Sequence, residues 1–153
     1  MITKSAQETI EFGRNLAKHL KPKDIIALIG ELGCGKTTLT KGIAEGLGVK
    51  NANYVNSPSF VLIREYKGRI NLYHLDFYRL DKLTDIEALG LKEYFYSDGV
   101  SVIEWAGKLK DLLPKDHLSI EMAIIDNNSR QITLKASGKR YESRTFFKKV
   151  RGK

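Results

Sequence analysis

The sequence predicts a single α/β domain in which helices flank a mixed central sheet with a parallel core and antiparallel hairpins. The first observation is a strand, a loop and a helix in that order: a β-branched apolar run at 25–29, a glycine-rich turn, and apolar residues at helical spacing over 38–47. The second is two pairs of strand-like runs, each joined by a short turn. The third is the length of 153 residues, which is about that of one domain.

The first predicted helix begins after Ser5 and ends near Leu20. Ser5 and Glu8 are spaced as in a capping box, and Pro22 cannot continue a helix. The helix carries an apolar stripe made of Ile10, Phe12, Leu16, Ala17 and Leu20. We therefore expect it to be one of the helices that flank the sheet.

The later part of the chain predicts two hairpins. Strand-like runs at 60–66 and 70–75 are joined by Lys-Gly-Arg, and runs at 118–125 and 131–136 flank the turn residues Asp-Asn-Asn-Ser at 126–129. The other expected elements are, in chain order, a polar loop at 48–58, a short helix at 84–88, a buried strand at 100–103 and a helix at 106–113 that ends before Pro114.

The composition excludes several classes of protein. Hydrophobic residues make up 42% and charged residues 29%, and no apolar run approaches the length of about 20 residues that a membrane span needs. The N-terminus lacks the apolar stretch of a secretory signal. The single cysteine allows no disulfide within the chain, which favours a reducing compartment. We therefore expect a cytoplasmic protein with no membrane partner.

The positive charge is concentrated at the C-terminus. The net charge is +8, of which residues 139–153 contribute +6, from seven Lys or Arg and one Glu. We therefore divide the chain into a domain at 1–138 and a basic C-terminal tail at 139–153. The tail either contacts RNA phosphates or an acidic partner, with Tyr141, Phe146 and Phe147 available for stacking, or it is a solvated end whose aromatic side chains pack back on the domain.

The glycine-rich turn at 30–37 reads GELGCGKT and fits the pattern G-x-x-x-x-G-K-[ST], the P-loop of nucleoside triphosphatases. Glycines allow successive backbone N–H groups to point inward at phosphate oxygens, and the following helix directs its positive end there. Lys36 supplies a positive charge and the hydroxyl of Thr37 a ligand for Mg²⁺. Cys34 occupies a variable position and is interpreted as small filler. The predicted domain is therefore a P-loop NTPase-like fold.

Two acidic residues follow strand-like runs and are candidates for the chemistry. Hydrolysis needs carboxylates that hold Mg²⁺ and position water, and acids at the carboxyl ends of strands are suitably placed. Glu104 ends the run Val-Ser-Val-Ile, and Asp76 follows the run at 70–75. Alternatively, Glu104 is a solvated strand-end residue and Asp76 caps a turn. Ser57 and Ser59 offer hydroxyls on the preceding loop, where nucleoside triphosphatases often carry a switch segment.

Four segments in order, GELGCGKTT, SPSF, LYHLDFYRL and IEWA, resemble the bacterial TsaE family of ATPases for tRNA threonylcarbamoyladenosine biosynthesis. The resemblance spans about residues 5 to 136, and its most distinguishing string contains His74, Asp76, Tyr78 and Arg79. It implies a small P-loop fold that hydrolyses ATP with Mg²⁺. It also implies TsaB and TsaD as partners, with TsaD transferring the threonylcarbamoyl group to adenosine 37 of tRNA, so that this chain meets tRNA through the complex.

The resemblance also implies roles for individual residues. It gives Thr37 and Glu104 to Mg²⁺, and it makes Asp76 a second acid near the metal waters or the attacking water. Ser59 stands where the family more often has Thr, which keeps a switch role for its hydroxyl. The resemblance implies a phosphate and nucleotide site made of Gly33, Cys34, Gly35, Lys36, Thr37, Thr38 and, from the late hairpin, Arg130. Trp105 follows the metal carboxylate as in the family, whereas Ala106 replaces a frequent Pro.

Other classes fit the sequence less well. A small P-loop kinase acting on a small-molecule acceptor is the alternative function, but an Arg-bearing lid is hard to place because the segment after Pro114 reads as hairpin strands. A GTPase would be expected to carry Asn-Lys-x-Asp, which does not occur in the chain. An RNA-binding module rests only on the charge of the tail.

Overall fold

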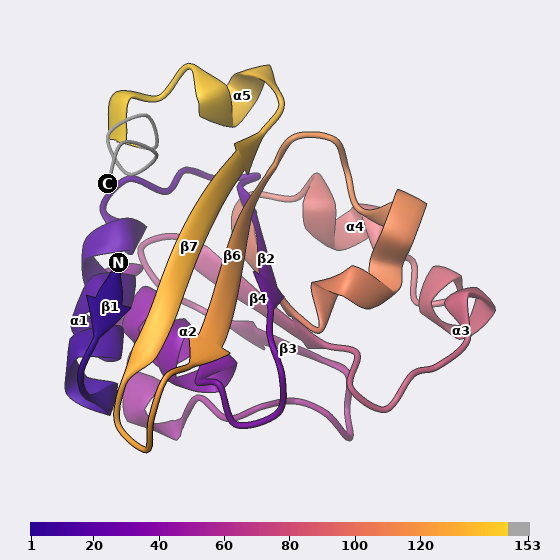
Figure 1. The fold of residues 1–153 in the computed structure, drawn as a ribbon. Coiled ribbons are helices and arrows are strands. Elements are labelled where there is room, and N and C mark those ends of the chain that lie inside the picture. The colour runs from indigo at the N-terminus through magenta and orange to yellow at the C-terminus, as the bar shows by residue number, and fades with distance from the viewer. Residues whose placement is uncertain (147–153) are drawn as a thin grey trace.

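In this computed structural model the structure describes residues 1–146, which form a seven-stranded mixed sheet with helices on both faces (Figure 1). The strand order is β1-β7-β6-β2-β5-β4-β3. The strands are β1 (Ile2–Thr3), β2 (Ile25–Ile29), β3 (Ile63–Tyr66), β4 (Asn71–Asp76), β5 (Gly99–Glu104), β6 (His117–Ile124) and β7 (Arg130–Ser137). Strand β2, which leads into the glycine-rich loop, lies at the centre of the sheet.

The centre of the sheet is parallel and its edges are antiparallel. Strands β6, β2, β5 and β4 run in parallel, whereas β3 pairs antiparallel with β4, and β7 pairs antiparallel with β6 and with β1. Both predicted hairpins are present. In the second, Asp126 accepts hydrogen bonds from the backbone N–H groups of Asn128 and Ser129, which lower the pKa of its carboxyl. The predicted mixed sheet with a parallel core is therefore confirmed.

Helices cover the two faces of the sheet in separate groups (Figure 1). Helices α1 (Ala6–Ala17) and α2 (Lys36–Gly46) cover one face; α3 (Leu83–Glu87), α4 (Lys92–Phe95) and the 3₁₀ helix η2 (Ala106–Leu112) cover the other. Alternate residues of β2 serve the two cores, with Ile26 and Leu28 facing α1 and α2 while Ile25 and Ala27 face the other group. A short 3₁₀ helix η1 (Ala52–Tyr54) lies in the predicted polar loop.

Glycines bring α1 and α2 into close contact. A Cβ atom at Gly13 would lie 2.6 Å from the carbonyl oxygen of Leu39, and one at Gly42 would lie 2.1 Å from that of Ile10. These distances are too short for a Cβ atom, so a larger residue at either position would push the helices apart. This packing fixes α2, whose first turn follows the glycine-rich loop, against the body of the domain.

Five segments differ from the sequence-based expectations. Residues 60–62 form a turn in place of the start of β3, with Leu62 at φ 69° and its N–H bonded to the carbonyl of Pro58. The helix expected at 106–113 is a 3₁₀ helix that is kinked at Lys110, where φ is 48°. The short elements β1, α4 and α5 (Lys139–Glu142) were not predicted, because two to four residues carry too little periodicity to detect.

The first residues of the basic tail pack on the domain. Tyr141 of α5 is fully buried in the core, and Phe146 stacks on His19 with ring centroids 3.9 Å apart. Arg140 and Arg144 both bind the fully buried carboxylate of Asp24, at 3.1 and 2.6 Å. The aromatic side chains thus pack back on the domain, as one of the two interpretations expects; Phe147 lies outside the described residues.

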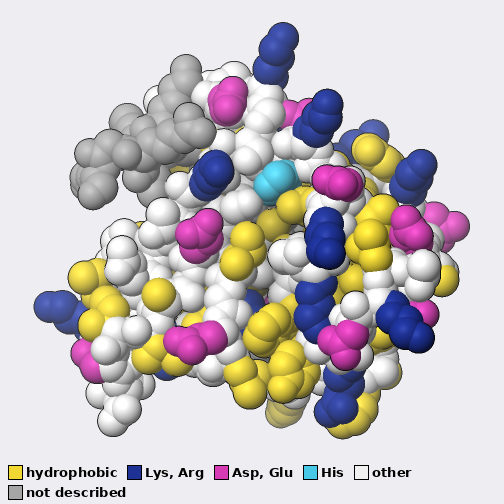
Figure 2. Space-filling model, turned by 45° about the vertical axis from the view of Figure 1, so that its right-hand side comes forward, with side chains coloured by type: hydrophobic (Ala, Val, Ile, Leu, Met, Phe, Trp, Pro, Cys, Tyr) yellow, Lys and Arg dark blue, Asp and Glu magenta, His cyan; other side chains and the backbone are white. Residues whose placement is uncertain are grey.

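Within residues 1–146, no helix has the length and apolar character needed to cross a bilayer. On the face shown in Figure 2, Lys and Arg side chains alternate with Asp and Glu side chains, and hydrophobic side chains lie between them. Among the described residues, side chains of opposite charge are therefore interspersed on this face.

Candidate functional site

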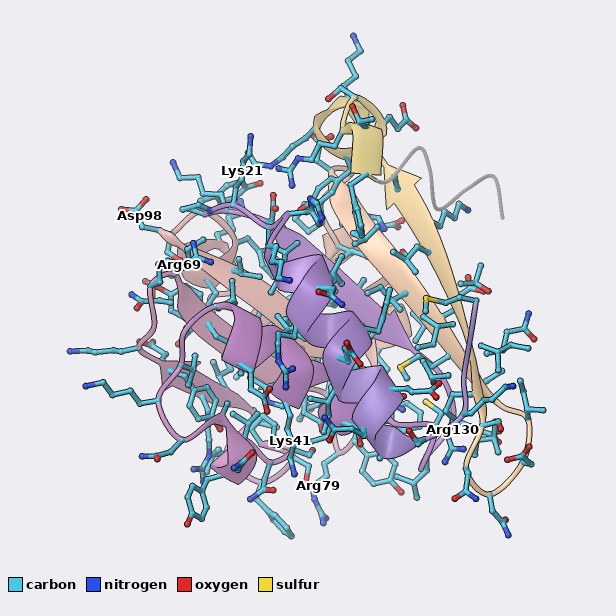
Figure 3. The ribbon with its side chains drawn as sticks, turned by 90° about the vertical axis from the view of Figure 1, so that its left-hand side faces the viewer. Lys21, Lys41, Arg69, Arg79, Asp98 and Arg130 are labelled. Carbon is cyan, nitrogen blue, oxygen red and sulfur yellow. The ribbon has the colours of Figure 1, made fainter. Side chains whose placement is uncertain are left out.

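The predicted site residues gather at one edge of the sheet. Because β2, β4 and β5 are parallel, their carboxyl ends meet at this edge, where sites of α/β proteins form. In Figure 3, Arg79, Lys41 and Arg130 mark this end of the molecule, and Lys21, Arg69 and Asp98 mark the opposite end, where the strands begin.

The loop between β2 and α2 has the backbone of an anion cradle. Gly33 and Gly35 adopt φ values of 80° and 101°, in the left-handed region that favours glycine. Gly35 is the N-cap of α2, and no side chain of the described residues caps that helix. The N–H groups of the first turn are therefore available to an anion, which the helix dipole also favours.

Lys36 points back over this loop. Its side-chain nitrogen donates to the carbonyl oxygens of Gly30 and Glu31, at 2.8 and 2.9 Å, and lies 4.2 Å from the centre of the Trp105 ring. Only 4% of Lys36 is exposed. Trp105 has φ 59°, so the chain turns sharply after β5 and brings the indole to the loop. The side-chain nitrogen also lies 3.5 Å from Sγ of Cys34. The loop thus offers an acceptor to each of the three ammonium protons, and the charge remains at the centre of the loop.

Thr37 and Glu104 meet directly. The hydroxyl of Thr37 donates to Oε1 of Glu104 across 2.8 Å, and Nε2 of His74 lies 2.8 Å from the same oxygen. Glu104 ends β5 and is 3% exposed, so it is not the solvated strand-end residue of the alternative interpretation. Because the hydroxyl hydrogen of Thr37 is engaged by a carboxylate, its lone pairs are free to face a cation.

Asp76 lies beside Glu104, because the two residues are register partners at the ends of β4 and β5. Its carboxylate accepts a hydrogen bond from the hydroxyl of Ser57 and a second one, of 2.8 Å, from the backbone N–H of Tyr78. Asp76 therefore links the preceding loop to the strand end in addition to facing the site. Ser59 lines the same hollow.

These side chains surround a hollow of about 430 Å³. Its lining consists of Leu32, Gly33, Gly35, Lys36, Thr37, Thr38, Ser57, Ser59, Asp76, Tyr78, Arg79, Glu104 and Trp105. A glycine-rich loop, a lysine, a hydroxyl and two carboxylates thus converge from separate segments of the chain. The volume lies within the usual range for small-molecule sites.

Sequence reasoning assigned no role to His74 or Arg79, although both belong to the string that most distinguishes the resemblance. Arg79 lines the hollow, and its guanidinium stacks on Phe60 with 3.9 Å between Cζ and the ring centre. No residue type or spacing marked either side chain as functional. Only the meeting of β4 with β5, and of the turn after β4 with the loop at 57–62, places them at the site.

Cys34 and Arg130 lie behind the loop, away from the hollow. The Cys34 side chain is fully buried in the core, so only its backbone is available to a ligand. Arg130 donates to the carbonyl oxygens of Cys34 and Gly33, at 3.1 and 3.2 Å. A smaller hollow of about 110 Å³ lies beside it, lined by Gly35, Thr38, Arg130 and residues of α1 and the β6–β7 turn. Arg130 therefore braces the loop from the side opposite the carboxylates.

The donor set fits Mg²⁺ held together with phosphates. Thr37, Glu104 and Asp76 offer hard oxygen ligands, which Mg²⁺ prefers. Among residues 1–146, no group of three or more His, Cys, Asp or Glu side chains could hold a metal ion alone. Mg²⁺ typically uses one or two carboxylates and completes its shell with waters and substrate phosphates. The site suits a metal that arrives with a nucleotide.

Comparisons with known proteins identify the family of the chain. The model of the family described as threonylcarbamoyl adenosine biosynthesis protein TsaE matches residues 3–132. The chain belongs to the TsaE family. A TsaE protein for tRNA threonylcarbamoyladenosine biosynthesis from Bacillus subtilis is 44% identical over 141 residues, which cover 92% of this chain and 87% of the relative. The TsaE protein of Treponema pallidum is 37% identical, with coverage of 87% and 97%.

A solved structure of the same family has the same fold. The crystal structure of Bacillus subtilis YdiB matches with a TM-score of 0.80 at 40% sequence identity, covering 94% of this chain and 88% of that chain. The matched part of the present chain includes most of the sheet and its flanking helices. The predicted TsaE resemblance and the P-loop NTPase-like fold are therefore confirmed.

Proposed function

We propose that this TsaE-family chain is a Mg²⁺-dependent ATPase that supports TsaB and TsaD in the threonylcarbamoylation of adenosine 37 of tRNA. The observation that carries the proposal is the convergence of Lys36, Thr37, Asp76 and Glu104 on one hollow beside the glycine-rich loop. A phosphate-binding loop alone would only bind; the two adjacent carboxylates add the groups that hydrolysis requires.

In this proposal the loop and Lys36 hold the phosphates of ATP. The free N–H groups at the start of α2 point at the phosphate oxygens, and the ammonium of Lys36 balances the negative charge that grows in the transition state. Lys36 is already enclosed by the loop carbonyls and Trp105. Its Nζ would exchange these hydrogen bonds for phosphate oxygens, and the enclosure keeps its charge at the loop, where a preorganised charge acts more strongly than that of a mobile surface lysine.

Thr37 and Glu104 hold Mg²⁺ in this proposal. The hydrogen bond of 2.8 Å between them fixes the Thr37 hydroxyl with its lone pairs outward. Held there, the metal would supply positive charge that offsets the negative charge of the phosphates. Glu104 would contribute a negative charge of its own and orient the hydroxyl.

Asp76 and the serine loop would act on the attacking water. The carboxylate of Asp76 has one oxygen engaged by Ser57 and the other by the backbone N–H of Tyr78. A carboxylate with its orientation fixed in this way can accept a hydrogen bond from water. Ser59 would complete a switch segment, since it lies on the same loop and lines the same hollow. Arg130 would hold the loop in place for the nucleotide, from the side opposite the carboxylates.

The surroundings of the hollow fit a protein partner that completes the site. Leu32 and Tyr78 line the hollow and are 66% and 42% exposed, and Phe60, 81% exposed, stacks on Arg79 at its rim. Exposed hydrophobic side chains around a site are typical of a protein interface. We assign this rim to the TsaB and TsaD pair, which would order the loop at 57–62 and raise the rate of hydrolysis.

The basic tail is a further point of contact with tRNA in this proposal. Arg140 and Arg144 are already paired with Asp24. Any contact of the tail with RNA phosphates would therefore fall mainly to its other basic residues. Contact with tRNA through the complex does not depend on the tail.

The test is phosphate release from ATP by the full chain, alone and with purified TsaB and TsaD, at varied Mg²⁺. We expect weak release by the chain alone, a marked rise with both partners, and none in the presence of EDTA. Transfer of phosphate to a small-molecule acceptor without release of free phosphate would instead favour the kinase alternative. Equal turnover with and without partners would contradict the supporting role.

A further inference from the structure

His74 is a buried histidine that the chemistry above does not use. It lies on β4, is fully buried, and its Nε2 is 2.8 Å from Oε1 of Glu104. Its second ring nitrogen, Nδ1, is buried and has no hydrogen-bond partner among the described residues. A polar side chain at the centre of a domain usually has both nitrogens satisfied. The single hydrogen bond of its ring to the described residues, with Glu104, therefore indicates what this side chain does.

The surroundings fix which nitrogen carries the proton. An ionised Glu104 has only acceptors, and Oε1 also receives the hydroxyl hydrogen of Thr37. His74 must then donate from Nε2. A proton on Nδ1 would leave a buried donor without an acceptor, which costs free energy. The neutral ring with hydrogen on Nε2 satisfies the Glu104 contact and leaves only a lone pair unpaired.

We propose that His74 is a positioning residue that fixes the Glu104 carboxylate for Mg²⁺; this inference rests on the proposed function and deepens it. Two donors, from Thr37 and His74, hold Oε1, so the carboxylate cannot rotate about its terminal bond without losing both. Oε2 takes no hydrogen bond from residues 1–146 and is left for the metal or its waters. His74 thereby orients a ligand, as outer partners of metal ligands commonly do.

Two substitutions of similar polarity separate this role from a general structural one. In His74→Gln the side-chain amide nitrogen reaches about as far as Nε2, so the donor to Glu104 is kept. In His74→Asn the amide reaches only about as far as Nδ1, so the donor is lost. Both variants bury an amide in place of the ring, so a structural cost falls on both, whereas the loss of positioning falls on His74→Asn alone.

The main readout is the affinity for ATP measured by fluorescence over a range of Mg²⁺ concentrations. We expect His74→Asn to need about tenfold or more Mg²⁺ for the same affinity, because the lost hydrogen bond is to a charged acceptor. Its affinity for ATP without metal should match that of the wild type. His74→Gln should restore most of the Mg²⁺ response. Equal losses with and without metal, or equal losses in both variants, would overturn the inference.

Coupling to Glu104 gives an independent test. If His74 acts through the carboxylate, His74→Asn should have little further effect on the Mg²⁺ response in a Glu104→Gln background. Independent, additive effects of the two substitutions would contradict the proposed route. Circular dichroism and thermal melting confirm that each variant is folded before it is compared.

A measurement on the unmodified protein avoids the risk that a variant fails to fold. The chain has three histidines, so their ring nitrogens can be resolved by ¹⁵N NMR at one fixed pH. We expect the His74 ring to carry hydrogen on Nε2. An unprotonated Nε2 would exclude donation to Glu104 and overturn the inference whatever the variants do.

Failure of this inference is distinct from failure of the proposed function. If the wild type shows no Mg²⁺-dependent binding of ATP, the proposed function falls, and the role of His74 falls with it. If the wild type shows that dependence and His74→Asn reproduces it unchanged, only the role of His74 is overturned.

Discussion

The hydroxyl of Thr37 and the carboxylate of Glu104 are 67 positions apart in the chain and 2.8 Å apart in space. One belongs to the first turn of α2 and the other ends β5, which pairs in parallel with β2. The contact thus depends on the central pairing of the sheet. Substitutions that disturb the pairing of β2 with β5 would therefore alter the proposed metal site, even where they lie far from it.

Replacing Lys36 with alanine should abolish ATP hydrolysis. Removal of the ammonium leaves the phosphates without the charge that stabilises the transition state, where single electrostatic contacts contribute about 3 kcal/mol or more. The measurement is phosphate release by folded Lys36→Ala protein in the presence of partners. Lys21→Ala, at the opposite end of the sheet in Figure 3, is the control and should behave as the wild type. Unchanged hydrolysis by Lys36→Ala would remove the loop from the mechanism.

Glu104→Gln should shift the Mg²⁺ requirement of hydrolysis to higher concentrations. The substitution keeps the shape of the side chain but removes the charge that would draw the metal to Thr37. Mg²⁺ titrations of activity for the variant and the wild type provide the measurement. Curves that overlay would show that Glu104 is not a metal ligand.

Asp76→Asn should depress hydrolysis far more than it weakens the binding of ATP. The amide oxygen can still accept from the backbone N–H of Tyr78, and the amide nitrogen can donate to the hydroxyl of Ser57, so the loop should stay in place. The group proposed to orient water nevertheless loses its charge. The rate of hydrolysis and the affinity for ATP are measured in parallel. The control is Asp98→Asn, a substitution at an exposed position. An equal loss in rate and affinity would instead assign Asp76 to binding.

Asp24→Asn should lower the free energy of unfolding by about 3 kcal/mol, because it leaves partly buried arginines without the charge that pairs with them. The carboxylate is fully buried and binds Arg140 and Arg144, and it raises the pKa of the Arg144 guanidinium. Denaturant titration gives the free energy. Asp81→Asn, which breaks a pair with Lys108 at a side chain that is 92% exposed, is the control and should change stability little. If Asp24→Asn also changed the free energy of unfolding only slightly, the buried ion pairs would contribute no more to stability than the exposed pair does.

Stability should fall at alkaline pH partly through Tyr141. Burial, and then the negative charge of Asp24, raise the pKa of the Tyr141 hydroxyl above its ordinary value of 10.0. The folded state therefore keeps a proton that the unfolded state loses above about pH 10, so the free energy of unfolding falls by at most about 1.4 kcal/mol per pH unit for this group. Below that pH the contribution is complete.

The measurement is the free energy of unfolding of the wild type and of Tyr141→Phe at pH values from about 8 to about 11. The variant loses the hydrogen bonds of the hydroxyl with Ile25 and should be less stable at neutral pH. Its stability should then depend less steeply on pH above about 10 than that of the wild type. Parallel curves for the two proteins would exclude Tyr141 as the source of the alkaline loss.

The glycine-rich loop, its flanking strand and helix, and the two hairpins were predictable from the sequence because their signals are local. The loop follows from the positions of its glycines and Lys36, and the hairpins follow from alternating apolar runs and turn residues. Both candidate acids were predictable as well, because each ends a strand-like run. Short elements such as α5 were not, since their stability comes from contacts such as the burial of Tyr141.

The sequence by itself determined that this chain carries a glycine-rich loop of the P-loop pattern, two strand-end carboxylates and the motifs of the TsaE family. Only the tertiary structure decided that Thr37 and His74 contact the carboxylate of Glu104. The same is true of the hydrogen bond from Ser57 to Asp76 and of the ion pair between Asp24 and Arg144 in the basic tail. The reason is physical. Periodicity and turn chemistry are properties of neighbouring residues, whereas these contacts depend on which strands pair and in which register, and that is set by packing across the whole domain.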